Sequence, residues 1–190
     1  MMILVANLGS TSFKFRLISI DGRDDRLVAQ GGFERVDDHG VAIDQCVTVL
    51  RDGGLIDSLD DLDAVGFKAV FGGEVSGCQL ADDRVLGALE RYSDIAPAHN
   101  PAYASGIRQF RDRAPNLPLV ALFETAFYQW TTEASQRYAV PESWWDAGVR
   151  RYGFHGSSHK FVAERSAELQ GRSDVAEITR RLYLDGPAEP

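Results

Sequence analysis

Apolar residues along the chain gather first in short runs that predict β-strands. Residues 2–7 form one run and residues 13–20 a second, and the polar segment Gly9 to Ser12 between them indicates a β-hairpin. Further runs predict strands over 26–36, 41–50, 64–71 and 119–123. Residues 41–50 alternate roughly by two, as a half-buried strand does. The run at 64–71 is almost continuously apolar, so we expect a buried strand of a mostly parallel sheet.

Helical spacing and helix-start residues appear between and after these runs. They predict helices over 82–92, 99–110, 126–137 and 158–170. Ser157 is a suitable N-cap for the last of these helices, and Gly171 is a suitable C-cap. Beyond Gly171 the sequence becomes charged, so we expect an unstructured end over 172–190.

Composition narrows the classes of protein that fit this pattern. The chain has 190 residues, 44% of them hydrophobic, which suits one large domain or one domain with a fragment of another. Its net charge of −8 disfavours nonspecific binding to nucleic acid or to an anionic membrane. No apolar stretch reaches the length of a membrane span, and no signal peptide is recognisable. With only two cysteines, the chain is expected to be cytoplasmic.

The hairpin tip carries the first candidate chemistry. Hydroxyl groups and backbone N–H groups between Asn7 and Lys14 can surround an anion, and Lys14 can add a positive charge. This is an arrangement that can hold a transferable phosphate. A Ser/Gly hairpin also occurs commonly with no ligand, and that interpretation stays open on this segment alone.

Three other segments place polar residues directly after apolar ones. They are Gly72-Gly73-Glu74, Ala96 to Pro101 and Arg151 to His159. Segments in such positions can meet at one edge of a sheet. His155 and His159 are four residues apart and also permit a zinc pair, as in a metal-dependent hydrolase, although no third ligand with suitable spacing is visible. The competing interpretation makes His159 a capping or packing residue.

Together with Phe123-Glu124-Thr125-Ala126-Phe127, these segments resemble the acetate kinase family of acetate, propionate and butyrate kinases. The resemblance runs in order from about Ile3 to Gly171 and is most specific at Arg150 to Gly156. It implies an α/β fold of the actin/sugar-kinase/Hsp70 type (ribonuclease H-like) with the start of a second domain. Residues 1–150 would form the first domain, and 151–171 would open the second.

The resemblance also implies roles for individual residues. The first phosphate-binding loop is matched by Asn7, Ser10, Ser12 and Lys14, with Asn7 near the magnesium ion. His99 matches a histidine that holds the acyl-phosphate oxygens, and His155 one that steadies the phosphoryl group in transfer. Glu124 stands where the family has its active-site aspartate, and Lys68 where it has a catalytic arginine.

By the same resemblance, the chain would use ATP with Mg²⁺ and a short-chain carboxylate, and would form a homodimer. The family's second phosphate loop, adenosine pocket, further arginine and magnesium-binding glutamate lie beyond the position of Gly171. Activity is therefore expected to need a complementary C-terminal half. Lys68, Phe71 and Glu124 all depart from the family's motifs, and these departures favour the alternative of a catalytically silent binding or assembly module.

Overall fold

The computed structural model describes residues 1–22 and 24–185. Residues Met1 to Leu122 form one compact unit, and the residues from Phe123 onward form a second. In the part that the structure describes, the first unit contains six β-strands, three α-helices and one short 3-10 helix, η1. Its strands are β1 (Met2–Leu8), β2 (Ser12–Asp21), β3 (Asp24–Glu34), β4 (Ala64–Ala69), β5 (Cys78–Leu80) and β6 (Leu119–Phe123). Its helices are α1 (His39–Asp52), η1 (Leu59–Asp61), α2 (Asp83–Arg91) and α3 (Asn100–Arg113).

The strands form one mixed sheet in the order β3-β2-β1-β4-β6-β5. β1 pairs with β4 in parallel, whereas β1 with β2, β2 with β3 and β5 with β6 are antiparallel. The predicted strands 2–7, 13–20, 26–36, 64–71 and 119–123 are confirmed, but the mostly parallel sheet is wrong. The first three strands are joined as hairpins, so their pairs are antiparallel. The apolar run of β4 indicates only that this strand is central and buried, and not which way its neighbours run.

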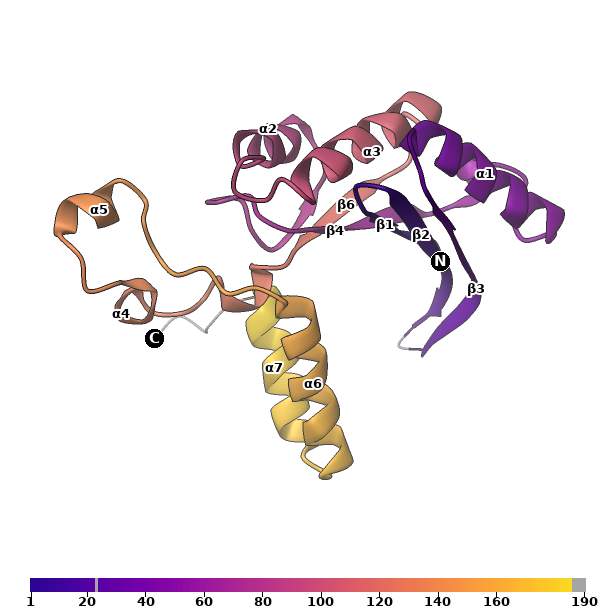
Figure 1. The fold of residues 1–190 in the computed structure, drawn as a ribbon. Helices are drawn as coiled ribbons and strands as arrows, with labels where there is room; N and C mark the ends of the chain where they lie inside the picture. Colours follow the sequence, from indigo (N-terminus) through magenta and orange to yellow (C-terminus); the bar gives the residue numbers. More distant parts are fainter. Residues whose placement is uncertain (23, 186–190) are drawn as a thin grey trace. The chain divides into compact units, whose positions relative to one another are not determined.

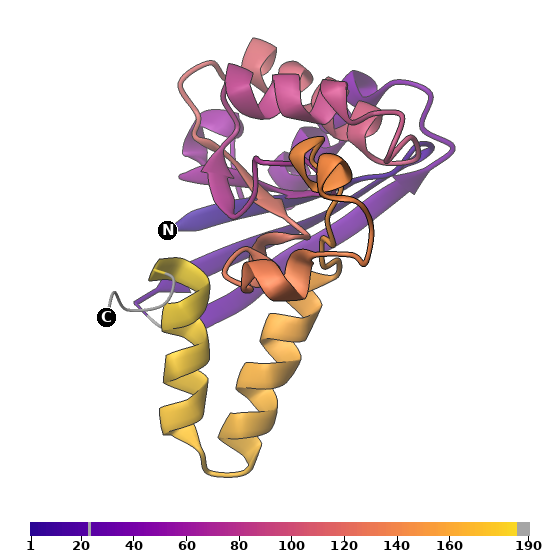
Figure 2. The same ribbon diagram turned by 90° about the vertical axis from the view of Figure 1, so that its left-hand side faces the viewer.

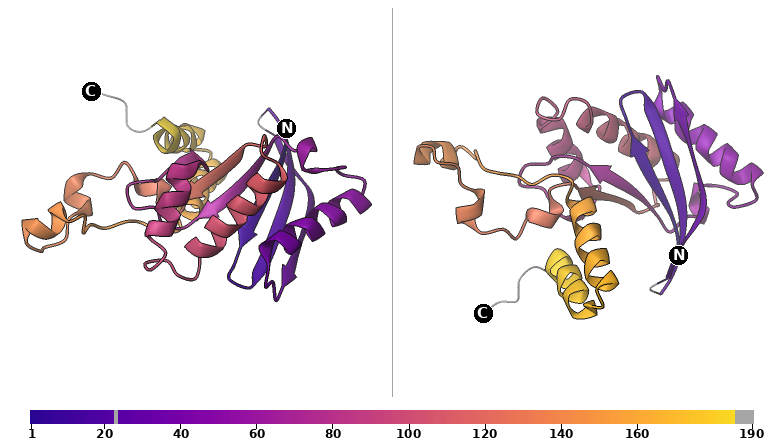
Figure 3. Two further views of the ribbon diagram at one scale, coloured as in Figure 1. Left: turned by 90° about the horizontal axis from the view of Figure 1, so that it is seen from above. Right: turned by 60° about the horizontal axis from the view of Figure 1, so that its bottom comes forward.

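Side chains alternate between two faces along the central strands. Figures 1 and 3 show α1 and α3 lying along one face of the sheet. That face contains the core, formed by residues such as Phe13, Leu17 and Phe67, each no more than 2% exposed. The next side chains along the same strands, including Lys14 and Lys68, are exposed on the opposite face. Burying the apolar set under the helices is what fixes the strand register.

The segment 41–50 is helical, so the predicted strand there is wrong. Asp38 caps α1, because its side chain accepts a hydrogen bond from the N–H of Gly40 at 2.7 Å. Ile43, Cys46 and Leu50 then lie on the buried side at helical spacing. Val41 and Val49, which produced the apparent alternation, are about half exposed. The predicted helices over 82–92 and 99–110 are confirmed as α2 and α3.

The second unit contains short elements and one helical hairpin. They are η2 (Ala126–Tyr128), α4 (Glu133–Gln136), α5 (Glu142–Asp146), α6 (Gly156–Leu169) and α7 (Ser173–Asp185). A continuous helix over 126–137 is therefore wrong, because turn residues separate η2 from α4. Figure 2 shows α6 and α7 running side by side.

Details at both ends of α6 and beyond it also differ from expectation. The helix over 158–170 is confirmed, but His155 occupies the N-cap position, so Ser157 as cap is wrong. Gln170 occupies the C-cap position, and Gly171, which was expected there, follows it with a φ of +71°. The unstructured end over 172–190 is wrong for Ser173–Asp185, where α7 packs on α6 and buries Ala176. Residues 186–190 lie outside the described residues, and the domain boundary expected at residue 150 stays a prediction.

Candidate functional site

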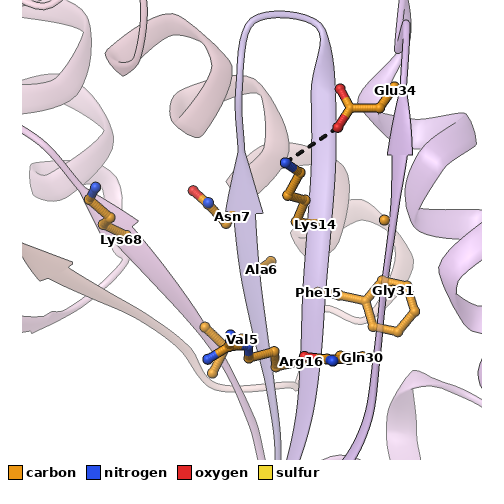
Figure 4. A pocket seen from close by; sticks show the side chains of 11 residues that line it. Val5, Ala6, Asn7, Lys14, Phe15, Arg16, Gln30, Gly31, Glu34 and Lys68 are labelled. Carbon is orange, nitrogen blue, oxygen red and sulfur yellow. Dashed lines mark ion pairs between the residues drawn. The ribbon is translucent and has the colours of Figure 1, made fainter.

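A pocket of about 740 Å³ opens on the exposed face of the sheet in the first unit. We call it the strand-face pocket (Figure 4). It is lined by Val5, Ala6, Asn7, Lys14, Phe15, Arg16, Gln30, Gly31, Gly32, Glu34 and Lys68. Three predicted site residues, Asn7, Lys14 and Lys68, thus lie around one cavity. The strand pairing explains this, since Asn7 is directly opposite Lys14 and the neighbouring pair Ala6 and Phe67 brings Lys68 alongside.

The strand-face pocket is positively charged although the protein as a whole is acidic. Its lining holds the basic side chains Lys14, Arg16 and Lys68. Glu34 supplies the only carboxylate in that lining, and it lies 3.3 Å from the Lys14 ammonium. Both partners of this ion pair are well exposed, so the pair is weak and an anionic ligand can compete for Lys14. An anion is therefore the ligand that this lining favours.

The hairpin tip beside the pocket is fixed by backbone and side-chain contacts. The N–H of Gly9 donates to the carbonyl of Ser12 at 2.8 Å, which closes the turn. The Gly9 carbonyl also lies 3.0 Å from Nε2 of His39, at the start of α1. Ser10 is exposed at the tip and Ser12 is half-buried; neither lines the strand-face pocket. The contact from His39 was not anticipated, because thirty residues separate it from Gly9.

His99 lies at the N-cap position of α3 with its side chain exposed. The next residue, Asn100, is fully buried, and its Nδ2 donates to the carbonyls of Phe71 at 2.8 Å and Leu89 at 3.1 Å. Asn100 thus ties the start of α3 to the loop after β4 and to the end of α2. This anchor determines where the backbone of His99 lies.

Tyr103, one turn further along α3, joins two of the predicted residues. Its backbone N–H donates to the carbonyl of His99 at 3.1 Å. Its hydroxyl donates to Oδ1 of Asn7 at 2.7 Å. Tyr103 and Asn100 were both missed by the sequence analysis. Asn100 directly follows His99, but nothing local distinguishes a buried asparagine from an exposed one.

The segment Gly72-Gly73-Glu74 has a structural explanation. Gly73 has a φ of +61°, and a Cβ there would collide with the Tyr92 ring. Glu74 accepts hydrogen bonds from Arg91 at 2.9 Å and from the Tyr92 hydroxyl at 3.0 Å. A hydrogen bond from its own backbone N–H, the hydrogen bond from Tyr92 and the nearby positive charge of Arg91 hold the pKa of Glu74 below its usual value. The segment thus fastens the loop after β4 to the end of α2.

Two further predicted residues face each other in the second unit. Glu124 follows β6 and is 5% exposed, and its carboxylate Oε1 lies 3.7 Å from Nδ1 of His155. Its backbone carbonyl accepts the N–H of Gly156 at 2.8 Å, and a Cβ on Gly156 would collide with that carbonyl. His155 itself has a φ of +58°, a left-handed conformation that is uncommon outside glycine. This uncommon backbone conformation beside a buried carboxylate keeps His155 and Glu124 as candidate site residues.

Metal binding by His155 and His159 finds little support. His159 Nδ1 is hydrogen-bonded to the Tyr128 hydroxyl, and the two rings meet edge to face with centroids 5.8 Å apart. Among the side chains that the structure describes (1–22 and 24–181), no group of three or more His, Cys, Asp or Glu residues is placed to hold a metal ion. His159 thus has the packing role that the sequence left as an alternative.

None of the helices in the described part of the chain has the length and apolar character that crossing a bilayer requires.

Comparison with known proteins finds a matching family profile and related sequences. A family profile described as Acetokinase family matches residues 29–182. The chain is 38% identical over 193 residues to an acetate kinase of Oceanobacillus iheyensis, which covers 89% of this chain and 48% of the relative. An acetate kinase of Bacillus cereus is also 38% identical, with 90% of this chain and 48% of the relative covered. The chain thus spans about half the length of the curated relatives it matches.

Solved structures agree in fold and in coverage. The acetate kinase of Porphyromonas gingivalis superposes with a TM-score of 0.77 at 34% identity, covering 90% of this chain and 49% of that one. A propionate kinase from Francisella tularensis gives a TM-score of 0.73 at 30% identity, again over 90% and 49%. Both similarities indicate the actin-like α/β fold expected from the sequence.

Proposed function

Because the chain belongs to the acetokinase family, we propose that it is the phosphate-binding half of an acyl kinase. The reaction would transfer the γ-phosphoryl group of ATP to a short-chain carboxylate, giving an acyl phosphate and ADP. Since the chain spans 48% of its curated relatives, activity would require a complementary C-terminal half. The observation that carries the proposal is the strand-face pocket, with Asn7, Lys14 and Lys68 around one cationic cavity.

The chemistry fits such a pocket. Phosphoryl transfer leaves little covalent work for the protein, which must position two reactants and stabilise negative charge. Lys14 and Lys68 line the pocket and would supply positive charge, while the hairpin tip beside it would supply hydrogen-bond donors from its amides and hydroxyls. Ser10 and Ser12 would serve as donors from the tip. The carboxylate substrate is already a nucleophile, so no general base is needed.

Residues outside the strand-face pocket complete the proposal. His99 would hold an acyl-phosphate oxygen, and His155 would hold the phosphoryl group during transfer. Glu124 would fix the orientation of His155, because its buried carboxylate lies 3.7 Å from the imidazole Nδ1. A cytoplasmic location and a homodimer stay predictions from the sequence.

Magnesium would accompany ATP and neutralise its phosphates, as it does in this class of reaction. The residues that line the strand-face pocket do not by themselves form a binding site for Mg²⁺. Mg²⁺ prefers carboxylates and water in octahedral geometry. The strand-face pocket contributes a single carboxylate, and that carboxylate is paired with Lys14. The ion would therefore have to be held mainly by the nucleotide and by groups outside this pocket.

Reconstitution tests the proposal. The 190-residue chain is mixed with the C-terminal half of a relative such as the acetate kinase of Oceanobacillus iheyensis, and acyl phosphate is trapped with hydroxylamine. We expect product only when both parts, acetate as the short-chain carboxylate, ATP and Mg²⁺ are present. Lys14→Gln should abolish it, whereas Arg108→Gln, on the outer surface of α3, should not. A folded mixture that makes no acyl phosphate would contradict the proposal.

Lys68 gives a second measurement on the same mixture. Lysine cannot make the planar two-point contact of arginine with a phosphoryl group or carboxylate. One added charge-assisted hydrogen bond contributes about 1.5–3 kcal/mol. We therefore expect Lys68→Arg to raise kcat about 10–100-fold.

The alternative is a catalytically silent binding or assembly module. Lys68, Phe71 and Glu124 favour it, because all three stand at motif positions where the family has other residues. The double variant Lys68→Arg with Glu124→Asp separates the two functions. A silent module stays inactive in the reconstituted mixture even with both residues restored.

A further inference from the structure

One hydrogen bond sets the orientation of the Asn7 amide. The Tyr103 hydroxyl donates to Asn7 Oδ1 at 2.7 Å. Tyr103 is only 1% exposed, and its backbone N–H is bonded to the carbonyl of His99. Its ring is therefore fixed by the packing of α3. Because the amide oxygen and nitrogen lie on opposite branches of the side chain, holding Oδ1 against Tyr103 turns Nδ2 away from it.

We propose that Asn7 acts as an amide donor to a phosphoryl oxygen, and that Tyr103 is the residue that positions it. The inference rests on the proposed phosphate-binding function and departs from the role that family resemblance implied, that of a residue near magnesium. A carboxamide can offer either a metal-binding oxygen or two N–H donors. Here the oxygen is engaged by a buried hydroxyl, and the donors are left for the ligand.

The surroundings of Asn7 favour an anion over a cation. Figure 4 shows Asn7 on the same strand face as Lys14 and Lys68. Lys14 is its direct partner across the β1–β2 pair. A cation beside Asn7 would meet these two ammonium groups, whereas a phosphate would be attracted by both. Glu34 does not reverse this balance, because it lies against the Lys14 ammonium.

Because the Tyr103 side chain is buried, its hydroxyl needs a hydrogen-bond partner within the protein. A buried tyrosine hydroxyl generally has a hydrogen-bond partner, and Asn7 Oδ1 provides one. Tyr103→Phe would keep the ring packing of α3 but release the Asn7 amide to rotate. The Tyr103 hydroxyl should therefore affect anion affinity without touching the anion.

The test uses the full 190-residue chain, labelled with ¹⁵N, and two separate probes. Inorganic tripolyphosphate is titrated without metal, and Mg²⁺ is titrated alone. We expect tripolyphosphate to shift the Asn7 side-chain amide signals and Mg²⁺ to leave them unchanged. Asn7→Asp should weaken tripolyphosphate binding about 10-fold or more, because it replaces a donor with a negative charge. Asn116→Asp, the same change at an exposed loop residue, is the matched control.

Tyr103→Phe tests the positioning role. We expect weaker tripolyphosphate binding with the dispersed amide spectrum of the folded chain retained, while Tyr138→Phe, at an exposed ring, leaves binding unchanged. The inference is overturned if Asn7→Asp keeps tripolyphosphate affinity, or if the wild-type amide responds to Mg²⁺ and Asn7→Asp strengthens that response. If the folded wild-type chain binds no tripolyphosphate, the proposed function fails together with the inference.

Discussion

Asn100 is a buried polar residue that anchors the start of α3. It is fully buried, its Nδ2 bonds the carbonyls of Phe71 and Leu89, and its Oδ1 is buried with no partner among the described residues. Leaving a buried carbonyl without a donor costs about 1–3 kcal/mol. We expect Asn100→Ala to lower the free energy of unfolding of the first unit by about 2–3 kcal/mol.

The measurement must report on the first unit. All three tryptophans lie in the second unit, so fluorescence would follow the wrong part of the chain. Amide hydrogen exchange in β4 and α3 gives the required free energy. Asn116→Ala, at an exposed position, should leave exchange in both elements unchanged. An Asn100 variant with wild-type protection would mean that the amide is not the anchor of α3.

Residues of the strand-face pocket could be foreseen because local sequence marks them. Asn7, Lys14 and Lys68 lie in or directly after apolar runs, where strand alternation and strand ends leave polar side chains accessible. Tyr103 could not be foreseen, since it contacts Asn7 across 96 positions of sequence. Its value to the site depends on which face of α3 is buried and on the position of α3 over β1. Only the tertiary fold supplies that information.

Elements were predictable where one periodicity dominates. In α1 two periodicities compete, because Val41, Ile43, Val47 and Val49 alternate while Ile43, Cys46 and Leu50 follow helical spacing. The Asp38 cap and the packing of α1 against α3 favour the helix. The sequence shows Asp38 as a possible N-cap of α1, but it does not show that α3 packs against α1. The same reasoning applies to 173–185, which are helical because α6 provides a surface to pack on.

The contact between α1 and α3 gives a pH-dependent prediction. Asp44 of α1 accepts two hydrogen bonds from Arg113 of α3, at 2.7 Å and 2.9 Å. This bonding holds the pKa of Asp44 below its usual 3.8. A carboxylate with a lowered folded-state pKa stabilises the fold above the unfolded-state pKa and loses that contribution as pH falls through the folded-state value.

We therefore expect Asp44→Asn to destabilise the first unit at neutral pH by about 0.5–1 kcal/mol, since Asp44 is largely exposed. The difference from wild type should shrink below pH 3.8 and vanish once Asp44 is protonated in both states. Amide hydrogen exchange in α1 and α3 across this pH range measures the difference. Asp25→Asn, at an exposed position in β3, is the control. A constant difference at every pH would show that the ion pair is not its cause.

At the scale of the whole molecule, the fold class followed from family motifs, while the state of the second unit did not. Ten of the sixteen large hydrophobic side chains that are exposed among the described residues belong to residues 123–190. On α6 they include Phe161, Val162 and Leu169, which are 64%, 56% and 72% exposed. The contact between α6 and α7 instead buries small side chains, Ala167 and Ala176, with Glu164 held by Lys160 at 2.8 Å. Among the side chains that the structure describes in this hairpin, residues 156–181, Phe161, Val162 and Leu169 thus lie outside its core.

Exposed apolar groups of this size favour association in water. We expect the 190-residue chain to self-associate as its concentration rises, and Phe161→Lys with Leu169→Lys to suppress that association by placing two charges on α6. Sedimentation velocity over a wide concentration range measures the effect. Val41→Lys with Val49→Lys removes two half-exposed apolar residues from α1 in the first unit, and should leave association unchanged. If the α1 variant suppresses association and the α6 variant does not, the adhesive surface lies on the first unit and the second unit tolerates its exposed residues.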